Sequence, residues 1–146
     1  MPYKYPLPDF LNGILTQQAY KKWLDRKAVT HKRRDCKRGN KIATNSLYKR
    51  AIHEAVLDSL GKDFYTGEQL IWTLLSKYNN VESKKHRRAY KAKFALLPSV
   101  DHVDDGLGAA NFKICAWRTN DAKNDLSHDD FVALCLRVAS HHKNRK

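Results

Sequence analysis

The chain has 146 residues, a hydrophobic fraction of 42% and a formal net charge of +13, from 28 Lys and Arg against 15 Asp and Glu. This length predicts one domain, or one domain with an extended arm, and the charge favours nucleic acid as partner before an anionic membrane surface. The same net charge is also compatible with a ribosomal protein or with a protein whose charged surface is simply solvated. No segment has the apolar length of a membrane span or a secretory signal, so we expect a cytoplasmic protein with no membrane partner.

The three cysteines, Cys36, Cys115 and Cys135, lie far apart, and no C-x-x-C pair exists. A zinc site built on cysteine thiolates is therefore not expected. Cys115 and Cys135 lie in apolar runs, which predicts that both thiols are buried in the core. The odd number of thiols is typical of a reducing compartment.

The first predicted helix lies near the N-terminus, where apolar residues recur at spacings of three and four from Leu15 to Leu24. The chain then becomes strongly basic, and Asp35 is the only acidic residue between Arg26 and Arg50. Clustered basic side chains with so few acids favour contact with phosphates over a simply solvated helix face.

The middle of the chain is less regular. Gly39-Asn40 indicates a turn, and the apolar spacing that follows predicts a helix from about Ser46 to Leu60. The segment from Asp63 to Leu75 is an aromatic turn with apolar residues that fit either a helix or a strand. The polar, basic stretch from Ser76 to Lys93 is predicted to be partly loop.

The clearest pattern lies in the last third of the chain. Residues Val100–Val103 and Phe112–Trp117 are predicted strands, joined by a loop that begins at Asp104. The pattern turns helical from Asn120, and Ser127 is predicted to cap a final helix. That helix is expected to place an apolar face against the body, formed by Phe131, Leu134, Cys135 and Val138.

Polar residues at the ends of these elements form a set suited to phosphodiester hydrolysis. Asp101 and Asn120 offer oxygen ligands for a hard divalent cation, which would polarise a phosphate and stabilise a departing oxygen. A neutral imidazole at His102, with an ordinary pKa near 6.5, can deprotonate water. Asn111 can tie the hairpin loop, and Lys123 can reach phosphate. Singly, these residues also fit a histidine bonded to Asp101, a turn former and a helix cap, but the ordered spacing favours a shared site.

The order Asp101-His102, then Asn111, then Asn120 with Lys123 resembles the HNH nuclease family. The resemblance implies an α+β fold with a ββα-metal (His-Me finger) nuclease core and surrounding α-helices. It implies His102 as general base, Asn111 as orienting residue, and Asp101 and Asn120 as ligands of one divalent metal ion, Mg²⁺ or Mn²⁺ before Zn²⁺ or Ni²⁺. The Asn-x-x-Lys form resembles the HNH domain of CRISPR effector nucleases.

Many HNH proteins flank the site with two C-x-x-C pairs that hold a structural zinc. Asp63 and Thr66 stand where the first pair is expected, and Ala116 and Thr119 where the second is. Because both pairs are missing together, we expect no structural zinc. Aromatic packing is expected in its place, from Phe64, Tyr65, Trp72 and Trp117.

The resemblance divides the chain into a basic helical arm, residues 1–62, and an HNH nuclease core, residues 63–146, within one compact domain. Phosphate contacts that fix position without reading sequence are expected from basic residues in both parts. These candidates are Arg33, Arg34, Lys37, Arg38, Arg87, Arg88, Arg118 and Lys123.

The pattern as a whole predicts a metal-dependent HNH endonuclease, a phosphodiester hydrolase, that acts on DNA. One alternative is a nucleic-acid-binding protein that keeps the HNH scaffold without catalysis, and another is a ribosome-associated basic protein. A lone HNH site cuts one strand, so a double-strand break would require a homodimer or two separate events.

Overall fold

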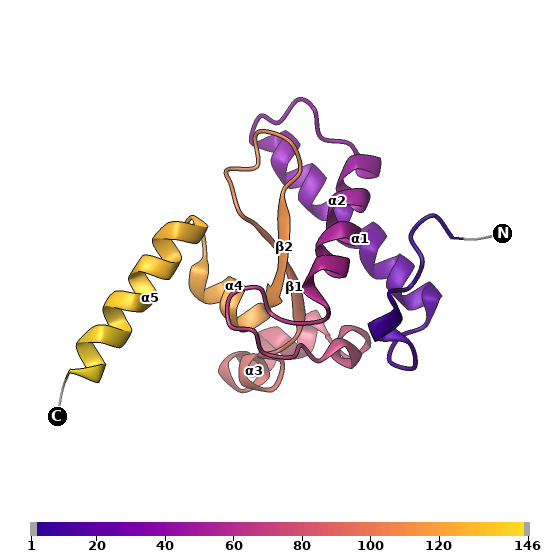
Figure 1. Ribbon diagram of the computed structural model, residues 1–146. Helices are drawn as coiled ribbons and strands as arrows, with labels where there is room; N and C mark the ends of the chain where they lie inside the picture. Colours follow the sequence, from indigo (N-terminus) through magenta and orange to yellow (C-terminus); the bar gives the residue numbers. More distant parts are fainter. Residues whose placement is uncertain (1–2, 145–146) are drawn as a thin grey trace.

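The computed structural model describes residues 3–144, and the chain is α+β, with five α-helices and one two-stranded antiparallel sheet in this range. The hairpin lies at the centre, with two long helices along one side and the shorter helices at its base (Figure 1). In chain order the elements are η1 (Asp9–Leu11), α1 (Gln17–Lys37), α2 (Asn45–Ser59), η2 (Trp72–Ser76), α3 (Asn80–Lys93), β1 (Pro98–His102), β2 (Phe112–Ala116), α4 (Trp117–Lys123) and α5 (His128–Lys143), where η marks a 3-10 helix.

Both predicted N-terminal helices are confirmed, and each begins at a threonine cap. The hydroxyl of Thr16 accepts the N–H of Ala19 at the start of α1, and the hydroxyl of Thr44 accepts the N–H of Leu47 at the start of α2. After α2 the chain turns at Gly61, whose φ of +88° suits glycine because other residues are strained there.

The hairpin that carries the site is held in register by the side chains that it buries. Val100 lies opposite Ile114 and His102 opposite Phe112, and the strands start and end within two residues of the predicted limits. Val100, Phe112 and Ile114 belong to one hydrophobic cluster with Trp23 of α1 and Ile52 of α2. This cluster contains residues from both sides of the division expected near residue 62, so α1 and α2 pack directly on the hairpin.

The segment from Ser76 to Lys93 is more helical than its composition predicts. Its first residues form an irregular turn, and the remainder is α3, with a kink at Arg87. The side chain of Asn79 caps α3 by accepting the N–H groups of Val81 and Glu82. Tyr90 at the end of α3 packs in a small separate cluster, which holds the basic helix against the body.

The final helix differs most from its prediction. Ser127 caps α5 as expected, with its hydroxyl accepting the N–H of Asp130, but of the four residues predicted to face the body only Phe131 is buried. Leu134 and Val138 are exposed and so is Cys135, because α5 extends away from the rest of the chain after its first turn (Figure 1). The prediction of a buried thiol is therefore wrong for Cys135 and confirmed for Cys115. None of the helices in the described range combines the length and apolar character needed to span a membrane.

Candidate active site

Three of the predicted site residues meet at the end of the hairpin. A cavity of about 490 Å³ opens where β1 gives way to the loop that follows it. Asp101 and His102 of β1 and Asn120 of α4 all line this cavity, together with Arg34 and Arg38 from the end of α1. The structure thus brings the predicted metal ligands, the predicted base and part of the basic helix to one hollow.

Asp101 is held by two donors from different parts of the chain. The hydroxyl of Tyr65 donates to its Oδ2 at 2.6 Å, and the Nζ of Lys123 lies 3.2 Å from its Oδ1. Burial and the Asp101 carboxylate raise the pKa of Tyr65, so the phenol stays a donor. Lys123 also donates to the carbonyl of His102. This almost fully buried ion pair ties α4 to β1, and Asn120, one turn earlier on α4, comes to the cavity with it.

The amide of Asn120 is oriented by a hydrogen bond. Its Nδ2 donates to the hydroxyl of Ser99 at 3.0 Å, which leaves Oδ1 as the amide atom available to a ligand. A carboxylate and an amide oxygen on neighbouring elements fit a hard divalent cation, with water or phosphate oxygens completing its coordination. Among residues 3–144 there is no group of three or more His, Cys, Asp or Glu that could hold a metal, so the fit rests on these two oxygen donors.

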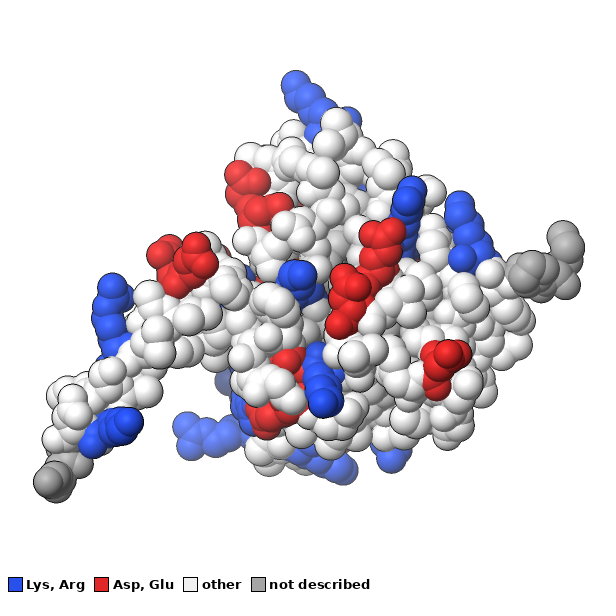
Figure 2. All heavy atoms as spheres, in the orientation of Figure 1, with Lys and Arg blue, Asp and Glu red and all other residues white. Residues whose placement is uncertain are grey.

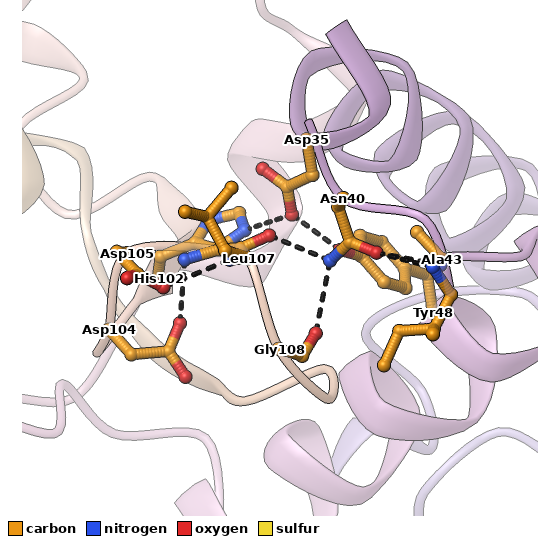
Figure 3. A network of polar contacts seen from close by, with 11 residues as sticks. Asp35, Asn40, Ala43, Tyr48, His102, Asp104, Asp105, Leu107 and Gly108 are labelled. Carbon is orange, nitrogen blue, oxygen red and sulfur yellow. Dashed lines mark hydrogen bonds and ion pairs between the residues drawn. The ribbon is translucent and has the colours of Figure 1, made fainter. Parts of the chain in front are cut away.

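His102 has a partner that the sequence did not predict. Its Nε2 lies 2.6 Å from Oδ2 of Asp35, and the hydroxyl of Tyr48 donates to the same oxygen (Figure 3). A carboxylate can only accept, so the proton of a neutral ring belongs on Nε2 and the lone pair on Nδ1. Within the described range, Nδ1 has no hydrogen-bond partner. The alternative of a histidine bonded to Asp101 is therefore wrong: the partner is a fully buried carboxylate 67 residues earlier in the chain.

The loop after β1 closes over Asp35 and is fixed to the α1–α2 junction. Asn40 donates through Nδ2 to the carbonyls of Gly106, at 2.7 Å, and Gly108, at 3.0 Å (Figure 3). Gly106 has a φ of +75°, and a Cβ there would lie 2.9 Å from Oδ1 of Asp35. Glycine is thus required at this point for the loop to approach the carboxylate. Oδ1 of Asp35 is itself buried without a hydrogen-bond partner in the described part of the chain.

His31, one helical turn before Asp35, forms an inner wall of the cavity. Its ring lies 5.0 Å from the ring of His102, centroid to centroid, and is almost fully buried. Burial, together with smaller contributions from the nearby His102, Arg34 and Lys27, lowers the pKa of His31 to about 3. His31 is therefore neutral at pH 7 and presents an uncharged surface to His102.

Asn111 does not join the others. It is exposed just before β2, and it contacts the hairpin through its backbone carbonyl, which accepts the N–H of Val103 at 3.5 Å. Its side chain makes no hydrogen bond within residues 3–144 and does not line the cavity. The orienting contact expected from Asn111 comes instead from Asp35, which was visible in the sequence as the only acid in a long basic stretch.

The predicted phosphate-binding residues fall into different environments. Arg34 and Arg38 line the cavity, and Lys123 lies inside it, paired with Asp101. Arg118 is exposed and paired with Glu68. The other predicted contacts are exposed on α1 or α3, namely Arg33, Lys37, Arg87 and Arg88.

The four positions expected to stand in place of C-x-x-C pairs, Asp63, Thr66, Ala116 and Thr119, meet around the carboxylate of Asp63. Oδ1 of Asp63 accepts the N–H groups of Tyr65, at 2.7 Å, and Thr66, at 3.2 Å. Its Oδ2 accepts the N–H of Ala116, at 3.0 Å, and the hydroxyl of Thr119, at 2.7 Å. Asp63 is 2% exposed, so these bonds join the turn after α2 to the junction of β2 and α4 in a buried setting.

The expectation that aromatic packing fills this place is wrong. The four rings lie in three separate groups: Phe64 and Tyr65 contact His128, Trp72 contacts Trp23, and Trp117 contacts Tyr78 and Tyr90.

Comparisons of the chain with family models, with curated proteins and with solved structures give no match. The chemistry of the cavity is accordingly inferred from the residues that line it.

Proposed function

We propose that the protein is a metal-dependent endonuclease of the HNH type that hydrolyses phosphodiester bonds in DNA. The observation that carries this proposal is the pairing of His102 with the buried carboxylate of Asp35. His102, Asp101 and Asn120 line one cavity together with Arg34 and Arg38. A histidine with a fixed tautomer, two oxygen donors and two guanidinium groups are the parts that attack on a phosphodiester needs.

His102 is the general base. Because Asp35 accepts the hydrogen of Nε2, the lone pair of Nδ1 is free to take a proton from the attacking water. The carboxylate then stabilises the positive charge that develops on the ring. His31 and Phe112, whose rings lie 5.0 and 4.7 Å from that of His102, restrict the imidazole to this orientation.

Residues from different elements around the cavity hold the substrate phosphate. Arg34 and Arg38 bind its non-bridging oxygens through charge-assisted hydrogen bonds. Asp101 and Asn120 would hold a divalent metal ion, which would supply charge stabilisation for the phosphate and the departing 3′ oxygen. Lys123 neutralises Asp101 in the protein alone and keeps α4, with Asn120, against β1.

The test is cleavage of supercoiled plasmid with Mg²⁺ or Mn²⁺, which EDTA should abolish. His102→Ala should lower the rate by roughly 10²-fold or more, the usual contribution of a general base. His86→Ala is the matched control, because His86 is exposed on α3, where it pairs with Glu82, and does not line the cavity. Equal rates for wild type and His102→Ala, across several metals and DNA forms, would show that the catalytic assignment is wrong.

One observation favours a second candidate, a nucleic-acid-binding protein without catalysis. The ammonium of Lys123 already satisfies the carboxylate of Asp101, which lowers the demand of that carboxylate for a cation. Calorimetric titration with Mn²⁺ separates the two candidates. Salt-sensitive DNA binding with no Mn²⁺ binding and no cleavage would support the second.

A further inference from the structure

The helix α5 is attached to the body only at its start. Phe131 is buried against the ring of Tyr65, at a centroid distance of 5.4 Å, and Ser127 caps the first turn. Beyond this turn the helix projects away from the other elements (Figure 1). Its large apolar side chains are left open, with Leu136 63% and Val138 52% exposed.

These apolar side chains share one broad face. At about 100° per residue, the larger apolar side chains between 132 and 138 occupy a continuous sector of roughly 200° around the helix axis, and Ala133 lies outside it. The members of this apolar face are Val132, Leu134, Cys135, Leu136 and Val138, with Ala139 between them. Figure 2 shows the same helix with little charge along most of its length, acidic groups near its start and basic groups further along. A helix with so wide an apolar sector is normally covered by another element.

We propose that the apolar face of α5 pairs antiparallel with the α5 of a second copy of this chain. The charges at the two ends of α5 select this occupant. Asp129 and Asp130 lie in the first turn, and His141, His142 and Lys143 lie in the last. Antiparallel pairing sets each acidic first turn beside a basic last turn and also opposes the two helix dipoles, whereas parallel pairing would set acid beside acid.

The spacing of the charges fits a two-fold axis. Asp129, Leu136 and Lys143 recur every seven residues along one edge of the apolar face. In a symmetric antiparallel pair, each edge of the apolar face lies against the same edge of the partner helix. A two-fold axis near Leu136 therefore brings Asp129 opposite Lys143 of the partner subunit. On the other edge, Asp130 then lies opposite His141 of the partner subunit. Asp129 and Lys143 thus carry opposite charges at equal distances, seven residues, on the two sides of Leu136.

The size of the face predicts a reversible dimer. A helix of 16 residues is about 24 Å long, so one helix pair buries less surface than permanent dimers do. This pairing is independent of the proposed nuclease function, because no residue of the cavity takes part in it.

The test is sedimentation velocity of the full chain across a wide range of concentration, with variants on α5. The wild type should shift from the mass of one chain to that of two as concentration rises. Leu136→Asp should stay monomeric, and because Leu136 is exposed in the single chain its fold, followed by circular dichroism, should not change. A wild type that stays monomeric at every concentration overturns the proposal.

A charge exchange tests the antiparallel arrangement itself. Asp129→Lys should weaken the dimer by roughly tenfold or more, because two symmetry-related pairs become repulsive. Adding Lys143→Asp to the same chain should restore the wild-type dissociation constant. Failure of the double variant to recover overturns the antiparallel register, as does a dimer that Asp129→Lys leaves unchanged. A monomer that instead binds anionic vesicles or DNA through α5 would assign the face to another occupant and overturn the proposal.

Discussion

Replacing Asp63 by alanine should remove a large part of the free energy of unfolding. The carboxylate accepts three backbone N–H groups and one hydroxyl at a site that is 2% exposed. Each buried donor left without a partner costs about 1 kcal/mol or more, so four of them cost on the order of 4–6 kcal/mol. A domain of this size is stable by only about 5–15 kcal/mol, so Asp63→Ala should lie near the limit of folding.

Two further variants sharpen this prediction. Asp63→Asn keeps one accepting oxygen but turns an NH₂ group toward one pair of donors, so it should cost roughly half as much as alanine. Asp58→Ala is the control, because Asp58 is exposed on α2 and should change stability by less than about 0.5 kcal/mol. Urea denaturation followed by tryptophan fluorescence and circular dichroism measures all three. A loss below about 1 kcal/mol for Asp63→Ala would refute the structural role of these bonds.

Two other predictions concern the cavity. Asp35→Asn should lower DNA cleavage by roughly 10²-fold with the fold retained, and nitrogen NMR should show that His102 loses its fixed Nε2–H tautomer. Tyr48→Phe should have a smaller effect on both. Full activity with an unchanged tautomer in Asp35→Asn would contradict the role of Asp35. His31 should make the fold acid-sensitive, because its pKa is about 3 in the folded chain and about 6.5 unfolded, so the unfolded chain takes up the proton first and stability falls as pH drops from 6.5 toward 3. At about 1.4 kcal/mol per pKa unit, the loss is on the order of 5 kcal/mol over the whole window and about 3.5 kcal/mol by pH 4. The urea midpoints at pH 7 and pH 4 should therefore lie closer together in His31→Phe than in the wild type. Equal acid losses in the two proteins would exclude this cause.

Local patterns predicted the elements that carry the cavity. The alternation around Val100 and Ile114 predicts two strands, and the polar residues at their ends predict that Asp101, His102 and Asn120 converge. These contacts are decided within one hairpin and the helix after it. Short-range periodicity and turn residues report such geometry directly.

Long-range packing decided the features that the sequence did not predict. The bond between His102 and Asp35 depends on how α1 lies across the hairpin, which no local pattern reports. The basic composition before Tyr90 suggested a loop, yet an asparagine cap and the packing of that ring produce α3. Periodicity identified the apolar side of α5, but it carries no information on what covers such a side, and Leu136 lies open in the single chain.

The junction at Asp63 is held by hydrogen bonds to a buried carboxylate, which neither a chelator nor an oxidant of thiols breaks. A cysteine–zinc cluster at this junction would come apart when its metal is stripped or its thiols are oxidised, and the fold would weaken with it. Hydrogen bonds to a carboxylate have neither vulnerability. A loss of DNA cleavage in EDTA would therefore not be explained by loosening of the junction at Asp63.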